Sequence, residues 1–254
     1  MKEYPYCFII GGTRCGTTAL LNYLLDACAD QLMAFIGTQE PYGQMGRFLD
    51  LMWSPEALKW HEEFEKKGIG KRRNLIYFSR FFIWNYPLAP EKFHRTFPNA
   101  KLIMMMRNPT DRALSLYIAN KTAMARWETL SFEKAIERPF DEDNEIDIQI
   151  YNYKQGSYWL RHIKRWEEFY PRENMMLIHS ESFFARPAQA MVNVQEFLGM
   201  KTFTIAKTYH KINAHRYPQK MKGDTREKLI EYFRPYNEEL YDYLGVDLGW
   251  EKAQ

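Results

Sequence analysis

Apolar residues follow two patterns along the chain: short unbroken runs, and stripes at helical spacing. The runs have the length and composition of buried strands and lie at residues 8–10, 33–36, 74–78, 102–106 and 174–179. Between them come stripes such as Leu20, Leu21, Leu24 and Leu25, which repeat on one helix face. Strands that alternate with amphipathic helices indicate a parallel sheet. We therefore expect an α/β fold, a single domain over residues 1–254 with a central parallel sheet flanked by helices.

A glycine-rich turn joins the first run to the first helix. Gly11 and Gly12 end the run, Gly16 follows, and the helical pattern begins after Thr17 and Thr18. Glycine lets the backbone approach an oxyanion closely, and a helix N-terminus offers unpaired N–H groups and the positive end of a dipole. The stretch therefore predicts a P-loop-like strand–loop–helix that binds an anion.

The positions of the basic side chains indicate which kind of anion this turn binds. Gly11 and Gly16 fit the first half of the phosphate-loop pattern G-x-x-x-x-G-K-[ST], but the lysine is missing and the cation stands earlier, at Arg14. A nucleoside triphosphatase also needs an aspartate after a second strand to help hold magnesium. The strand at 102–106 ends instead in Arg107, and an arginine binds anions rather than a metal. We expect a site for phosphate or sulfate groups without a metal ion.

Two motifs resemble those of sulfotransferases that use PAPS (3′-phosphoadenosine 5′-phosphosulfate). Residues 14–18, R-C-G-T-T, are similar to the family's 5′-phosphosulfate loop K-x-G-T-T, with Arg14 in place of lysine. Residues 107–117 match the family's 3′-phosphate motif R-[ND]-P-x-[DE]-R-x-x-S-x-Y throughout. The resemblance covers almost the entire chain. It implies transfer of a sulfuryl group from PAPS to an acceptor hydroxyl or amine, which leaves 3′,5′-ADP (PAP).

The resemblance also implies roles for individual residues. Backbone N–H groups of the loop would hold the 5′-phosphate, and Arg14 would stabilise charge on the bridging and leaving-group oxygens. Arg107 and Ser115 would hold the 3′-phosphate, because Ser115 follows eight residues later on the next helix, where the two side chains can converge. The implied nucleotide-binding residues are Arg14, Cys15, Gly16, Thr17, Thr18, Arg107, Ser115, Arg216 and Tyr217.

Two of these residues come from a third motif near the C-terminus. Residues 213–218, N-A-H-R-Y-P, resemble the basic loop K-G-R-K-Y-P that closes over PAPS in the family, and Arg216 and Tyr217 match best. The alternative interpretation is a C-terminal loop with incidental charges.

A short motif after the first helix implies the catalytic base. Residues 39–42, Q-E-P-Y, resemble the start of K-E-P-x-F-F in the heparan-sulfate-type and bacterial branch, whose glutamate is the base. Glu40 is thus the implied base, with Arg14 as the second catalytic residue. A glutamate in a surface turn is the alternative. The other large branch uses a histidine, for which this chain has no evident equivalent.

Composition limits the possible partners and the compartment. The net charge is +3, from 35 basic and 32 acidic residues, which is too weak to predict nucleic-acid binding. No apolar run approaches the about 18 residues that suggest a membrane helix, and the N-terminus lacks the features of a signal peptide. The three cysteines have no metal-ligand spacing. We expect a cytoplasmic protein in which Cys15 is a small filler rather than an activated thiol.

The acceptor is the least determined part of the function. Residues 141–147, D-E-D-N-E-I-D, argue mildly against a polyanionic glycan on that side. A small-molecule acceptor, such as a secondary metabolite, is the preferred prediction, and a saccharide or lipid is the alternative. A P-loop kinase and a non-catalytic nucleotide-binding protein are the rival classes. The sequence does not predict the oligomeric state.

Overall fold

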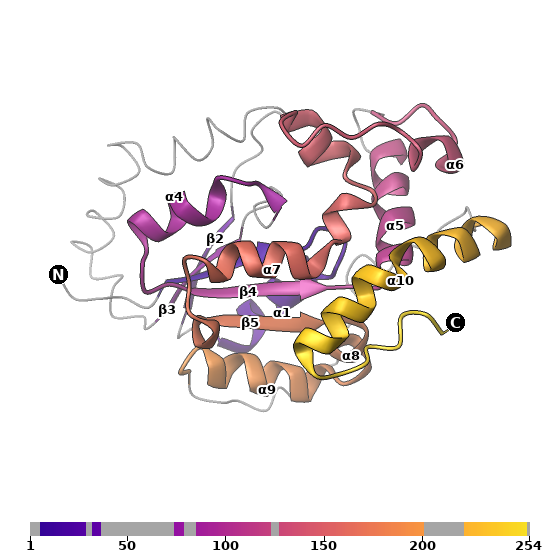
Figure 1. Cartoon of the computed structure of the whole chain (residues 1–254). Helices are drawn as coiled ribbons and strands as arrows, with labels where there is room; N and C mark the ends of the chain where they lie inside the picture. Colours follow the sequence, from indigo (N-terminus) through magenta and orange to yellow (C-terminus); the bar gives the residue numbers. More distant parts are fainter. Residues whose placement is uncertain are drawn as a thin grey trace.

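Strands from both halves of the chain join in one parallel sheet. The computed structural model describes residues 6–28, 32–36, 74–78, 85–122, 127–200 and 221–252. Within these ranges the sheet has five strands in the order β2-β3-β1-β4-β5, all parallel. The strands are β1 (Tyr6–Gly11), β2 (Leu32–Ile36), β3 (Asn74–Phe78), β4 (Lys101–Met106) and β5 (Met175–His179). The predicted α/β fold is confirmed (Figure 1).

The helices follow the strands in the expected alternation. They are α1 (Thr17–Cys28), α4 (Ala89–Thr96), α5 (Pro109–Thr122), α6 (Phe132–Ala135), α7 (Trp159–Glu167), α8 (Ser180–Ala185), α9 (Pro187–Phe197) and α10 (Gly223–Leu244). Three short helices of other types are η3 (Asp147–Tyr151), η4 (Gln155–Ser157) and η5 (Arg172–Asn174). Some starts carry their usual signals: Ser131 caps α6 by accepting a hydrogen bond from the Lys134 N–H.

Helices cover both faces of the sheet. On one face, the Phe8 ring of β1 meets Phe93 of α4, and Phe93 in turn meets Trp166 of α7. On the other, Tyr23 of α1 stacks on Phe183 of α8 at 5.7 Å between ring centroids. Figure 1 shows α4 and α7 on one side of β4 and β5, and α9 on the other.

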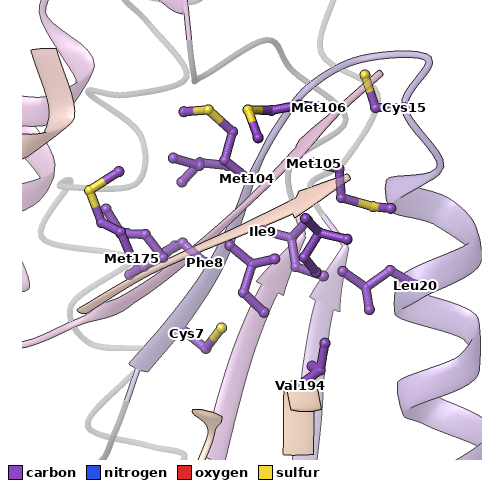
Figure 2. Packing of buried hydrophobic residues seen from close by; sticks show 14 of the residues in the cluster. Cys7, Phe8, Ile9, Cys15, Leu20, Met104, Met105, Met106, Met175 and Val194 are labelled. Carbon is purple, nitrogen blue, oxygen red and sulfur yellow. The ribbon is translucent and has the colours of Figure 1, made fainter. Parts of the chain in front are cut away.

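The core lies around β1 and β4. Five of the six residues of β4 are buried, which explains why this strand reads as an unbroken apolar run in the sequence. In Figure 2 Met105 points toward α1 and Leu20, while Met104 and Met106 point the other way. The chain reverses its direction across the sheet at β1, because the strand order runs outward to β2 and then returns to β4. Such a switch point is where ligands bind in open α/β sheets, beyond the carboxyl ends of the strands.

The acidic run and the last helix have structures that the sequence patterns above do not describe. The acidic run at residues 141–147 ends where the π-helix η3 begins, at Asp147. The last helix begins at Gly223 and continues through Pro235, which lies inside it.

Candidate active site

The turn after β1 forms the phosphate-loop geometry that the glycines predict. Gly11 and Gly16 have φ angles of 151° and 97°, in a region that favours glycine. Helix α1 then starts directly, with the Leu20 N–H donating to the Gly16 carbonyl at 3.1 Å. The first N–H groups of α1, including those of Thr17 and Thr18, have no acceptor within the helix. They are therefore placed to bind an oxyanion at the positive end of the helix dipole.

Arg14 has a left-handed backbone, with φ 66°, which is uncommon for a residue with a side chain. Its Nε donates to the Ser115 Oγ at 3.0 Å, across 101 positions of sequence. Its own carbonyl accepts a hydrogen bond from Arg107 Nη1 at 3.1 Å. The turn after β1 and the turn after β4 thus touch each other, and the residues predicted for the two ends of a nucleotide form one site.

A buried arginine on α5 holds the loop in place through hydrogen bonds. Arg112, on α5, is fully buried, and its Nε donates to the Thr13 carbonyl at 3.1 Å. The same guanidinium donates to the carbonyl and side-chain oxygens of Asn152 and to Ser157 Oγ. These contacts tie the anion loop to α5 and η4, so Arg112 acts on the loop through protein groups.

Trp159 contacts both the turn after β1 and the turn after β4. Its indole N–H donates to the Arg107 carbonyl at 3.1 Å. The edge of its ring lies over Gly12, where a Cβ atom would come within 2.6 Å of Trp159 Cη2. Gly12 also donates from its N–H to the Met105 carbonyl at 2.8 Å. The absence of a side chain at Gly12 is therefore a packing requirement.

Replacing Gly12 by alanine should lower the free energy of unfolding by about 1–3 kcal/mol, because the Trp159 ring would have to move in a filled core. Chemical denaturation measures this change. Gly223→Ala is the matched control, since a Cβ there meets nothing within 4 Å, and its effect should stay within about 0.5 kcal/mol. Equal stability of the two variants would show that the ring does not constrain the loop.

Cys15 sits inside the loop and is 1% exposed. Its carbonyl accepts a hydrogen bond from Ser180 Oγ at 2.6 Å. Burial raises the pKa of the Cys15 thiol to about 12, although Arg112, Arg107 and Arg14 act to lower it. The thiol therefore stays protonated at neutral pH, as expected for a small filler.

The charges around Cys15 define the electrostatics of the site. Within the described part of the chain, the charged side chains that act most strongly on the Cys15 thiol are three arginines and one carboxylate, Glu181. Burial, with a smaller contribution from Arg107 and Arg14, lowers the pKa of Arg112 to about 10, so the guanidinium remains protonated at neutral pH. The excess of positive charge favours an anion at this edge of the sheet.

The structure brings together those predicted residues that it describes. Residues 14–18, Arg107 and Ser115 meet at the carboxyl ends of β1 and β4. Glu40, Arg216 and Tyr217 lie outside the described residues. Sequence reasoning missed the contacts of Trp159 with both turns, because its position fits the apolar face of α7 and nothing in the pattern distinguishes it from core.

Comparison with known proteins agrees with this geometry. The sulfotransferase domain family matches residues 5–240. Human heparan sulfate glucosamine 3-O-sulfotransferase 6 is 23% identical over 274 residues, covering 98% of this chain and 74% of the relative. Human heparan sulfate glucosamine 3-O-sulfotransferase 3B1 is 25% identical over 276 residues, covering 98% of this chain and 66% of the relative. A crystal structure of a sulfotransferase from Alicyclobacillus acidocaldarius superposes with a TM-score of 0.75 at 24% identity, covering 98% of this chain and all of that one.

The chain therefore belongs to the sulfotransferase family. This confirms the resemblance to PAPS-dependent sulfotransferases, and the protein is an enzyme that uses PAPS as its co-substrate. Among the described residues, no group of three or more His, Cys, Asp or Glu side chains is arranged to hold a metal ion. No helix in the described part of the chain is long and apolar enough to cross a membrane.

Proposed function

We propose that this enzyme transfers the sulfuryl group of PAPS to a hydroxyl or amine of a small-molecule acceptor and releases PAP. The observation that carries the proposal is the contact of Arg14 with Ser115 at 3.0 Å, which joins the two phosphate motifs in one positively charged site. The 3′- and 5′-groups of PAPS stand on the same ribose, so neighbouring sites for the two are what the nucleotide requires.

The loop after β1 is proposed to hold the 5′-phosphosulfate. The acceptor oxygen or nitrogen attacks sulfur, the bond from sulfur to the bridging oxygen breaks, and negative charge collects on the 5′-phosphate of PAP. The N–H groups of Gly16, Thr17 and Thr18 and the Arg14 guanidinium stabilise this charge, in the manner of an oxyanion hole, whereas the Cys15 N–H already donates to the Gly12 carbonyl at 3.2 Å. Glu40 takes the proton that the acceptor loses.

The turn after β4 is proposed to hold the 3′-phosphate. Arg107 is half-buried, Ser115 is buried on α5, and each of them contacts Arg14. A guanidinium and a hydroxyl that converge on one phosphate give charge-assisted hydrogen bonds. Arg216 and Tyr217 are proposed to close over the bound nucleotide.

Replacing Arg107 by alanine should weaken PAP binding by about 10- to 150-fold, since a hydrogen bond to a charged group contributes about 1.5–3 kcal/mol. Binding of AMP, which has no 3′-phosphate, should change much less. Isothermal titration calorimetry with both nucleotides measures the difference. Arg234→Ala, which removes a cation paired with Glu231 on the surface of α10, is the control. Unchanged PAP affinity in the Arg107 variant would contradict the assignment of the 3′-phosphate.

The proposed small-molecule acceptor rests on the acidic run at residues 141–147. Glu142 is paired with Arg161, and the Asp147 carboxylate accepts the Asp141 N–H. Asp141 and Asp143 are exposed, so this surface keeps an excess of negative charge. Such a surface disfavours a long polyanion near it.

A saccharide acceptor is the second candidate, favoured by one specific observation. The curated relatives named above are glucosamine sulfotransferases of heparan sulfate. Labelled PAPS offered with a metabolite extract and, separately, with glucosamine-containing oligosaccharides distinguishes the two. Label in an extract component supports the small molecule, and label only in the oligosaccharide supports the saccharide. The cytoplasmic location stays a prediction.

The two rival classes have their own tests. Magnesium-dependent transfer of phosphate from ATP would identify a kinase. Tight binding of PAP without turnover on any acceptor would indicate a non-catalytic nucleotide-binding protein.

A further inference from the structure

The residue after Arg107 uses its polar groups to hold one turn in place. Asn108 is 2% exposed, and its backbone N–H donates to Glu181 Oε1 at 2.9 Å. Its side-chain Nδ2 donates to the Trp250 carbonyl at 3.0 Å, and its Oδ1 accepts the Thr110 N–H at 3.0 Å. Asn108 therefore links the turn after β4 to α8, to the C-terminal segment and to the start of α5.

The peptide group between Arg107 and Asn108 is held at both of its ends. Its oxygen accepts from the Trp159 indole at 3.1 Å, and its N–H donates to Glu181 at 2.9 Å. The orientation of this peptide plane sets the backbone angle ψ of Arg107, and so the direction in which the Arg107 side chain leaves the chain. A small rotation of the backbone moves the end of a long side chain by a large distance. The hydrogen bonds of this peptide group to Trp159 and Glu181 therefore help to determine the position of the Arg107 guanidinium.

Glu181 is itself anchored on its far side. Its second oxygen lies 2.8 Å from His179 Nε2. Burial acts to raise the pKa of Glu181, but hydrogen bonds from His179 and the Asn108 N–H outweigh it and hold the pKa below its usual value. The carboxylate is therefore ionised at neutral pH, and its first oxygen accepts the Asn108 N–H.

The C-terminal segment that carries Trp250 is clamped to α10. The Trp250 N–H donates to Tyr241 Oη at 3.1 Å, and that hydroxyl donates to Glu251 Oε2 at 3.0 Å. Asn237 Nδ2 donates to Glu251 Oε1 at 2.7 Å. Trp250 is 3% exposed. Its carbonyl is thus presented to Asn108 from a fixed position.

We infer that Glu181 and the C-terminal turn around Trp250 are positioning elements for Arg107, which set the enzyme's preference for a nucleotide with a 3′-phosphate over one without. The inference rests on the proposed function of Arg107. Neither element need touch the nucleotide, since both act through the peptide group and side chain of Asn108. Loss of either element should weaken the binding of the 3′-phosphate and leave the loop that binds the 5′-phosphate unchanged.

The test compares two variants of nearly equal size, Glu181→Met and Glu181→Gln. Both remove the charge, but only glutamine keeps an oxygen that can accept the Asn108 N–H. Calorimetry measures the ratio of the Kd for AMP to the Kd for PAP in each full-length variant. We expect the ratio to fall about tenfold in Glu181→Met, as for one lost hydrogen bond, and to stay within about threefold of the parent protein in Glu181→Gln.

This ratio separates positioning from a general effect on stability, because destabilisation weakens the binding of both nucleotides alike. Glu196→Ala, which removes an exposed carboxylate from α9, is the control and should leave the ratio unchanged. Turnover gives a second readout: Glu181→Met should raise KM for PAPS and leave kcat at saturating PAPS nearly unchanged.

Two outcomes would overturn the inference, and they have different meanings. If the parent protein prefers PAP over AMP and Glu181→Met keeps the full preference, Glu181 does not position Arg107. If the parent protein itself shows no preference, the proposed 3′-phosphate site fails and the inference fails with it.

Discussion

Replacing Glu40 by glutamine should lower kcat by about 10²- to 10⁴-fold, the range of a positioned general base. Glutamine keeps the shape of the side chain and cannot take the acceptor proton. PAP affinity should hardly change, because Glu40 is assigned to the acceptor rather than the nucleotide. Initial rates at saturating PAPS measure the first expectation, and calorimetry with PAP measures the second.

A matched control and a clear contrary result accompany this test. Glu239→Gln alters an exposed carboxylate on α10 and should retain full turnover. If Glu40→Gln also retains near-full turnover at saturating PAPS, Glu40 is not the base. Loss of PAP affinity in the variant would instead place Glu40 at the nucleotide.

Replacing Arg14 by alanine should lower kcat by about 10²- to 10³-fold, or about 2.7–4 kcal/mol, by analogy with the loss of an oxyanion-hole donor. The charge that develops on the 5′-phosphate as the S–O bond breaks would lose its guanidinium partner. Single-turnover measurements with preformed enzyme–PAPS complex report this step separately from product release. Arg14→Lys should recover part of the rate, because lysine restores the charge without the planar fork.

The backbone conformation of Arg14 makes the alanine and lysine variants directly comparable with the parent protein. Its φ of 66° is unfavourable for any residue with a Cβ, so alanine and lysine bear much the same strain as arginine. A change in kcat then reflects the lost guanidinium rather than a rearranged loop. Full kcat in Arg14→Ala would remove Arg14 from the catalytic group and leave it as a structural partner of Ser115.

Much of the fold was predictable because buried parallel strands read as unbroken apolar runs. The run at 102–106 became β4, which is buried on both faces. The sheet order was not predictable from these runs, since it depends on which strands pair. The short helix η4 at residues 155–157 was not predictable either, since Asn152 and Ser157 turn inward there to bind the Arg112 guanidinium. A Cβ at Gly156 would come within 2.2 Å of Asn152 Oδ1.

Those parts of the site that belong to contiguous sequence motifs were predictable. Residues 14–18 and 107–117 each match a recognisable sequence motif, and the structure places the two motifs in contact. Trp159 and Trp250 could not be found this way, because their contacts with the site depend on how α7 and the C-terminal segment pack. The bond of Glu181 to Asn108 could not be predicted either, because it depends on how α8 packs against the turn after β4.

The contact between Arg14 and Ser115 spans 101 positions, so the nucleotide pocket exists only after distant parts of the chain have assembled. Contacts of such long range form slowly in folding. A ligand that binds only the assembled state adds about 2.7 kcal/mol of stability when present at 100 times its Kd. The cellular supply of PAPS and PAP would then govern how long each enzyme molecule survives proteolysis, as well as how fast it turns over.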